Sequence, residues 1–128
     1  MNSVSRILGE AMTPHQKRIY KDPAKAVRWA IKHNQRFPEA EPYIVNNPGS
    51  AIAYAAVVLK GRWPEVEDTL VRSATLAYFY AKDAIKGRWP EAEETLAKDP
   101  VWSQNYLKLY PQAKLEWIMN GWLDWLDL

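Results

Sequence analysis

The sequence predicts an all-α protein, a single-domain, solenoid-like array of helical-hairpin repeats with a capping helix at each end. A motif recurs every 26 residues, and capping residues mark helix starts in successive copies. No segment alternates apolar and polar residues as a half-buried strand does. The 128 residues suit one domain. We divide the chain into an N-terminal cap (1–20), the repeats (21–110) and a tryptophan-rich C-terminal capping helix (111–128).

The repeated motif is an arginine and an aromatic residue followed by proline and two glutamates. The segment KGRWPEVEDTL at 60–70 recurs as KGRWPEAEETL at 86–96, with nine of eleven positions identical. An earlier copy, RFPEAEPYI, occupies 36–44, and YPQAKL at 110–115 is a decayed fourth copy that arrives five residues early. A helical pair this short cannot bury its apolar face alone, so we expect the copies to stack on one another.

Each motif predicts a short helix. Proline is favoured at the first helical position, and acidic residues suit the positive end of the helix dipole. We therefore expect short helices near 64–71 and 90–97, and about one turn in the first copy, where Pro42 limits the helix. The glutamate pairs are interpreted as first-turn stabilisers rather than acid–base catalysts, because residues two apart on a helix do not face each other.

Longer helices alternate with the short ones. Capping side chains mark their starts, four of them directly before a proline: Thr13, Asp22, Asn47, Ser73 and Asp99. Lys60-Gly61 and Lys86-Gly87 predict helix ends, because a cation followed by glycine is a typical stop. Two sets of apolar residues share one helical face each: Ile52, Ala55, Ala56 and Leu59, then Ala77, Tyr80, Ala81 and Ala84. Small alanines beside large rings indicate helices that approach closely.

Composition excludes several classes of protein. Hydrophobic residues make up 48%, which excludes a disordered chain, and 17 basic against 15 acidic residues indicate neither a nucleic-acid nor a membrane partner. The absence of cysteine excludes disulfides and thiol catalysis, and suits the cytoplasm, where we expect the protein to act. No apolar run is long enough for a membrane span, and the short apolar start, soon followed by Glu10, does not predict a secretory signal.

We expect neither an enzyme nor a metal or cofactor site. His15 and His33 lack metal-ligand spacing, and no nucleophile elbow or phosphate-binding glycine loop occurs.

Two sets of residues are candidate partner contacts. Arg36, Arg62 and Arg88 form a ladder that could follow nucleic-acid phosphates, but the favoured interpretation is structural, because each arginine repeats with its own glutamates. It would cover helix-end carbonyls or pair with the next unit's glutamates. Near the C-terminus an apolar stripe is interpreted first as a capping helix: Leu115, Ile118, Met119, Trp122, Trp125 and Leu126, widened by Trp117 and Leu123. The alternative is that Trp117, Trp122 and Trp125 are exposed anchors for a partner or a second copy.

The N-terminal third carries the one uneven charge. The favoured interpretation of this charge is a solvated helical face, and the alternative is a contact with an acidic protein surface or RNA. The basic residues are Lys17, Arg18, Lys21, Lys25, Arg28 and Lys32.

The Gly-Arg-Trp-Pro-Glu-Ala-Glu core resembles short tandem helical repeats of about this period in phage-encoded and bacterial proteins of mostly unassigned function. The resemblance covers about 21–115 and implies a repeat architecture. It also implies a protein of the bacterial host cytoplasm, such as a phage inhibitor of a CRISPR effector or nuclease. Our leading hypothesis is a non-catalytic module whose concave face and aromatic C-terminus dock onto a host or viral protein. Two alternatives stay open. One is a nucleic-acid-binding adaptor that uses the arginine ladder, and the other is a structural homo-oligomer.

Overall fold

The computed structural model describes residues 12–123, and every regular element in that range is helical, which confirms the all-α prediction. In chain order the elements are α2 (Pro14–Ile19), α3 (Pro23–His33), α4 (Glu41–Ile44), α5 (Pro48–Ala53), the π-helix η1 (Tyr54–Leu59), α6 (Pro64–Leu70), α7 (Ala74–Tyr80), the π-helix η2 (Ala81–Ile85), the 3₁₀-helix η3 (Pro90–Ala92), α8 (Glu93–Ala97), α9 (Pro100–Leu109) and α10 (Ala113–Met119).

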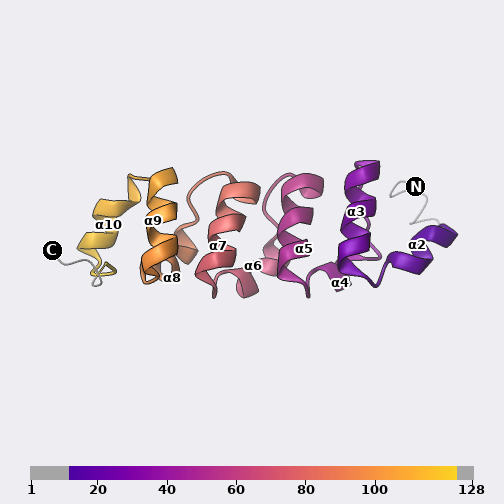
Figure 1. Ribbon diagram of the computed structural model, residues 1–128, viewed down its shortest axis with the longest axis horizontal. Coiled ribbons are helices and arrows are strands. Elements are labelled where there is room, and N and C mark those ends of the chain that lie inside the picture. The colour runs from indigo at the N-terminus through magenta and orange to yellow at the C-terminus, as the bar shows by residue number, and fades with distance from the viewer. Residues whose placement is uncertain (1–11, 124–128) are drawn as a thin grey trace.

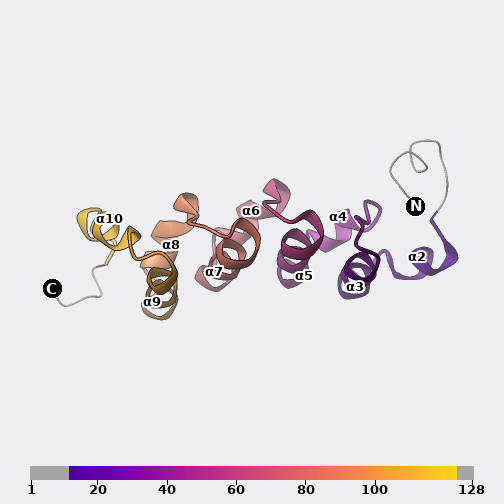
Figure 2. The ribbon, with the colours of Figure 1, turned by 90° about the horizontal axis from the view of Figure 1, so that it is seen from above.

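The longer helices stand side by side in chain order. Helices α3, α5, α7 and α9 form one row, each next to its neighbour (Figure 1). The short helices α4, α6 and α8 lie along the opposite side of the molecule (Figure 2). The row of longer helices bows, with α3 and α9 set forward of α5 and α7, so this side of the molecule is concave.

The predicted helix starts are confirmed by their caps. The Thr13 hydroxyl accepts from the Gln16 backbone N–H, and the Thr13 backbone N–H donates to Oε1 of the Gln16 side chain. Backbone N–H groups also donate to the side chains of Asp22, Asn47, Ser73 and Asp99 at the starts of the four longer helices. Each cap satisfies a helix-end donor that has no partner inside its helix.

At two helix ends, the residue that turns the chain is not the predicted one. The helices stop near Lys60 and Lys86 as expected, but these lysines themselves adopt the left-handed conformation, with φ of 59° and 60°. Neither Gly61 nor Gly87 has a positive φ. The wide final turn explains the difference, because the N–H of Lys60 and that of Gly61 both donate to the Ala55 carbonyl.

The predicted short helices are confirmed. Helix α6 and the η3–α8 pair fall where the motif places them, and α4, with Pro42 in its first turn, has only four residues. The two predicted faces also turn inward. Ile52, Ala55 and the whole second set are buried, and Ala56 and Leu59 pack half-buried against the core. Small and large side chains therefore interlock between neighbouring helices.

The prediction of a C-terminal apolar stripe is wrong in part. Leu115 and Met119 are 67% and 77% exposed, whereas Trp117 points inward and is fully buried. Helix α10 stops at Met119, and Gly121 turns the chain with a φ of 73°. Residues 1–11 of the predicted N-terminal cap, and Trp125 and Leu126 of the predicted C-terminal helix, lie outside the described residues.

Between residues 12 and 123 no helix combines the length and apolar character needed to cross a membrane.

Candidate functional sites: the Arg–Glu–Tyr clusters and the long-helix groove

Three identical clusters of side chains repeat along the molecule. Each contains an arginine, the glutamate five residues later and a tyrosine thirteen residues after that, and we call them the Arg–Glu–Tyr clusters. They are Arg36/Glu41/Tyr54, Arg62/Glu67/Tyr80 and Arg88/Glu93/Tyr106. The arginine comes from the loop before a short helix, the glutamate from the short helix itself and the tyrosine from the longer helix that follows.

The middle cluster shows the geometry. Arg62 donates to both oxygens of Glu67, through Nε at 2.9 Å and Nη2 at 2.8 Å. The Tyr80 hydroxyl donates to Oε2 of Glu67 at 2.6 Å and accepts from the backbone N–H of Trp63, also at 2.6 Å. One buried hydroxyl therefore ties the loop, the short helix and the longer helix together.

The other two clusters reproduce these contacts closely. Tyr54 and Tyr106 each donate to their glutamate at 2.6 Å. They accept from the backbone N–H groups of Phe37 and Trp89 at 2.8 and 2.9 Å. These N–H groups belong to the residue before a proline, in a loop, where the helix ladder supplies no acceptor. The tyrosine hydroxyl therefore gives each of these buried donors an acceptor.

The electrostatics of the middle cluster favour a charged glutamate and a neutral tyrosine. The hydrogen bond from Arg62 lowers the pKa of Glu67, against the opposing effect of burial and with further help from Tyr80. Burial raises the pKa of Tyr80 well above its usual range, and the hydrogen bond that it donates to the Glu67 carboxylate adds to this. A fixed carboxylate and a tyrosine that keeps its proton are suited to structure, since neither group exchanges protons near neutral pH.

The third cluster is extended by α10. Arg88 forms a second ion pair with Glu116 at 2.9 Å, and Trp117 Nε1 donates to Oε1 of Glu93 at 3.1 Å. Burial opposes ionisation of Glu93, but the hydrogen bonds from Arg88, Tyr106 and Trp117 outweigh it, and the net effect lowers the pKa of this carboxyl.

Trp117 takes the position that the motif aromatic has in earlier units. The Tyr54 and Tyr80 rings lie 5.2 and 4.9 Å from those of Trp63 and Trp89, and the Tyr106 ring lies 5.4 Å from that of Trp117. The 26-residue period would give this position to Leu115, which is exposed instead.

Trp117 is therefore a core residue, which corrects its assignment as an exposed partner anchor. Trp122 is half-buried against the same core, and Trp125 lies outside the described residues.

The arginine ladder is engaged within the protein. Each guanidinium binds the second glutamate of its own motif, and Arg88 also pairs with Glu116 in the segment that follows the third unit. Sequence analysis found the arginines and glutamates but missed the tyrosines, although Tyr54, Tyr80 and Tyr106 keep the same period of 26. The geometry favours the structural interpretation of Arg36, Arg62 and Arg88, and their assignment to a partner stays a prediction.

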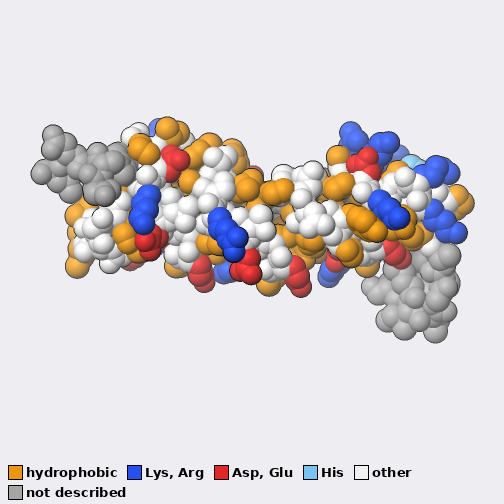
Figure 3. Space-filling view, turned by 90° about the horizontal axis from the view of Figure 1, so that it is seen from below, with side chains coloured by type: hydrophobic (Ala, Val, Ile, Leu, Met, Phe, Trp, Pro, Cys, Tyr) orange, Lys and Arg blue, Asp and Glu red, His pale blue; other side chains and the backbone are white. Residues whose placement is uncertain are grey.

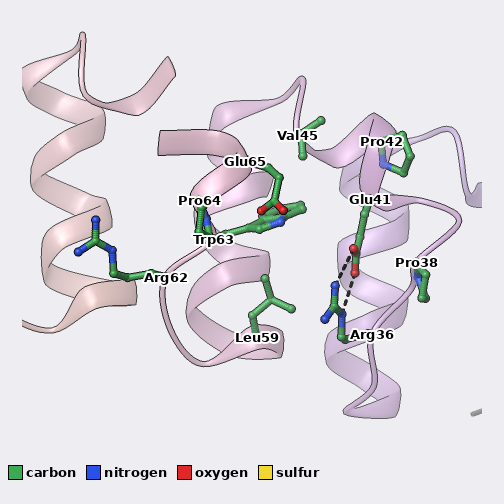
Figure 4. Close-up of a pocket in the computed structure, with 10 residues that line it drawn as sticks. All are labelled: Arg36, Pro38, Glu41, Pro42, Val45, Leu59, Arg62, Trp63, Pro64 and Glu65. Carbon is green, nitrogen blue, oxygen red and sulfur yellow. Dashed lines mark hydrogen bonds and ion pairs between the residues drawn. The ribbon is translucent and has the colours of Figure 1, made fainter. Parts of the chain in front are cut away.

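A cavity of about 650 Å³ separates the first two clusters (Figure 4). The paired Arg36 and Glu41 side chains form one wall, and Trp63 and Pro64 form another. The Arg62 guanidinium points away from the cavity, toward its own cluster. The opposite charges of Arg36 and Glu41 are paired with each other, and Glu65 adds a further carboxylate to the lining.

A second cavity, of about 630 Å³, lies on the concave side between the α5–η1 and α7–η2 helices, and we call it the long-helix groove. Its lining is mainly apolar: Ile52, Ala53, Ala56, Val57, Leu76 and Phe79, with Gly49, Asp83 and Lys86. Val57 and Phe79 remain 46% and 38% exposed. The space-filling outline is hollowed on this side, with hydrophobic side chains along the hollow (Figure 3).

Within residues 12–123 no three histidine or acidic side chains gather closely enough to hold a metal ion. Comparison with known proteins gave no match: no family model, no curated protein and no solved structure is significantly similar to the chain.

Proposed function

We propose that this chain is a non-catalytic protein-binding module, built as a solenoid-like array of helical hairpins whose ends are capped by α2 and α10. The Arg–Glu–Tyr clusters support this architecture, because each joins one short helix to the longer helix that follows. A rigid array of this kind holds the longer helices in a fixed row and presents their free faces to a partner.

The observation that carries the proposal is the long-helix groove. Val57 from the α5–η1 helix and Phe79 from α7 leave apolar surface in water beside the half-buried Ala53 and Ala56, while the opposite faces of the same helices are buried. Covering this surface releases about 25 cal/mol for each Å² of apolar area removed from water. Cavities of this size and character are typical of binding sites.

The charges beside the groove define the partner further. Lys86 lines the groove together with Asp83, which is paired with Lys82, and Lys60 is exposed at the end of η1, one of the helices that form the groove. Neither Lys60 nor Lys86 forms an ion pair with any residue in the described range. We propose that the groove takes an apolar segment of a partner protein, with acidic residues next to that segment opposite the two lysines. Charges of opposite sign at the rim steer association and set the orientation of the bound segment.

The specific form of this proposal is an inhibitor that occupies a site on a bacterial host or defence protein, such as a CRISPR effector or nuclease, in the bacterial cytoplasm. The sequence resemblance to phage-encoded repeats is its support. The structural homo-oligomer is the competing hypothesis, since a second copy could cover the same groove.

A matched pair of substitutions tests the groove. Val57→Lys places a charge in it, whereas Val101→Lys makes the same change at a 63% exposed position in the first turn of α9 that does not line it. We expect tagged wild type and Val101→Lys to capture the same protein stoichiometrically from nuclease-treated bacterial lysate, and Val57→Lys to lose it. Equal capture by both variants would contradict the proposal. A concentration-dependent dimer that only Val57→Lys dissociates would support the homo-oligomer instead.

A further inference from the structure

The basic residues of the N-terminal third are not balanced by acidic ones. Residues 12–35 contain six of the 17 basic side chains and one of the 15 acidic side chains. That acidic residue, Asp22, is occupied as the cap of α3, where it accepts from the backbone N–H of Lys25. Basic side chains gather at the end of the molecule that carries α2 and α3 (Figure 3). A field of one sign at one end of a nearly neutral protein attracts an anionic ligand to that end.

Three of these cations line a cavity of about 600 Å³ between α2 and α3, which we call the α2–α3 pocket. Lys25, Arg28 and Lys32 are three and four residues apart on α3, so they share one helical face. They span about 10 Å along the helix, at ~1.5 Å per residue. All three are exposed, and none forms an ion pair with another described residue.

An aromatic pair borders the same pocket. The His33 and Trp29 rings are stacked, with centroids 4.4 Å apart and planes 25° from parallel. His33 Nδ1 lies 2.9 Å from the Trp29 carbonyl oxygen, and because a carbonyl only accepts, Nδ1 donates in this bond and fixes the ring. Phe37 supports the pair from within the core, with its ring 4.9 Å from that of Trp29. His33 itself is exposed, so a ring held in a fixed orientation is available at the edge of a basic pocket.

We propose that the α2–α3 pocket binds a short stretch of single-stranded nucleic acid. Phosphates lie along Lys25, Arg28 and Lys32, with one phosphate opposite each cation. A base stacks on the outer face of the His33 ring. An acidic peptide would satisfy the three cations but would leave the aromatic pair unused. Positive charge combined with a stacking ring is the arrangement that recognises single strands. This site is separate from the long-helix groove and does not depend on it.

Fluorescence anisotropy with fluorescein-labelled U12 and dT12 tests the proposal over a range of salt concentrations. For wild type we expect log affinity to fall against log salt concentration with a slope of about −2, since three phosphates are neutralised at ~0.7 each. Lys25→Gln/Arg28→Gln/Lys32→Gln should weaken binding at least tenfold and flatten the slope. Arg72→Gln/Lys108→Gln/Lys114→Gln removes the same charge elsewhere on the surface and should stay within twofold of wild type. Far-UV circular dichroism confirms that both variants are folded.

Two further comparisons separate nucleic acid from a generic polyanion. His33→Ala should weaken U12 binding about fivefold through lost stacking, and labelled polyglutamate of equal charge should bind wild type at least tenfold more weakly than U12. Three results would overturn the proposal: no binding of wild type to U12 or dT12 at low salt, equal losses in the two triple variants, or polyglutamate binding as tightly as U12. The last result would identify an acidic protein segment as the ligand.

Discussion

Replacing Tyr80 by phenylalanine removes a single oxygen atom from the centre of the middle Arg–Glu–Tyr cluster. That oxygen accepts from the Trp63 backbone N–H and donates to the Glu67 carboxylate, each at 2.6 Å. A buried backbone donor left without an acceptor costs about 1–3 kcal/mol, and a hydrogen bond to a charged group contributes about 1.5–3 kcal/mol. We therefore expect Tyr80→Phe to lower the free energy of unfolding by about 3 kcal/mol. The melting temperature should fall by about 10 °C.

Urea unfolding followed by far-UV circular dichroism measures this change, and Tyr78→Phe is the matched control. Tyr78 lies on the same helix, and its hydroxyl forms no hydrogen bond with any residue between 12 and 123. The control should lie within about 0.5 kcal/mol of wild type, as is usual for changes away from buried networks. A loss below about 0.5 kcal/mol for Tyr80→Phe, or equal losses in the two variants, would refute the reasoning.

Three further predictions follow from the same contacts. Because the pKa values of Glu67 and Glu93 are lowered from 4.5 in the folded protein, the stability that these carboxylates contribute is present above pH 4.5 and is lost as the pH falls below it. Urea unfolding from pH 7 to 3 should show this loss, and the free energy of unfolding should fall less steeply with pH in Glu67→Gln. An equal dependence on pH in the two proteins would contradict the lowered pKa of Glu67. Gly61 has no positive φ, and nothing lies within 4 Å of an added Cβ, so Gly61→Ala should raise the free energy of unfolding by about 0.4–1 kcal/mol. Gly121 has a φ of +73°, so Gly121→Ala should lower the free energy of unfolding. Thermal melts in which the melting temperatures of both variants move in the same direction would show this to be wrong. Trp117→Ala should lower the free energy of unfolding by about 3–5 kcal/mol in the same unfolding assay, because the ring is fully buried. A change close to zero would contradict the burial of Trp117.

Local features of the fold could be predicted from sequence because their causes are local. A capping side chain fixes a helix start within a few residues, four of the five proposed caps stand directly before a proline, and all five form. The left-handed residues at Lys60 and Lys86 could not be predicted from the glycines that follow them. The last turns of η1 and η2 are wider than an α-helical turn, and this moves the change of direction one residue earlier.

The clusters needed long-range information that periodicity does not contain. The backbone N–H of Trp63 and the hydroxyl of Tyr80 are 17 residues apart, and only the packed hairpin brings them together. The rotation of α10 is a similar case. An apolar stripe shows that a helix has an inward face, but the positions of Glu93 and Tyr106 decide that Trp117 faces inward and Met119 faces solvent.

The candidate binding sites were predictable only in part. The basic residues of α3 were identifiable as uneven charge, and the structure adds the pocket and the stacked Trp29–His33 pair beside them. A concave binding face was predicted, but the long-helix groove on it was not, because its depth depends on the spacing of two helices 26 residues apart in sequence. Exposed Val57 and Phe79 are apolar residues like many others in the chain until the arrangement of the helices is known.

Amide hydrogen exchange, followed residue by residue by NMR, tests most directly the claim that the three Arg–Glu–Tyr clusters hold the array together. The backbone N–H groups of Phe37, Trp63 and Trp89 lie in loops, and each donates to a tyrosine hydroxyl. If the clusters are as described, all three should exchange at least about a thousandfold more slowly than the exposed first-turn amide of Glu65, and Tyr80→Phe should accelerate Trp63 alone. Rapid exchange of these three amides in the wild-type protein, at the rate of Glu65, would contradict the account.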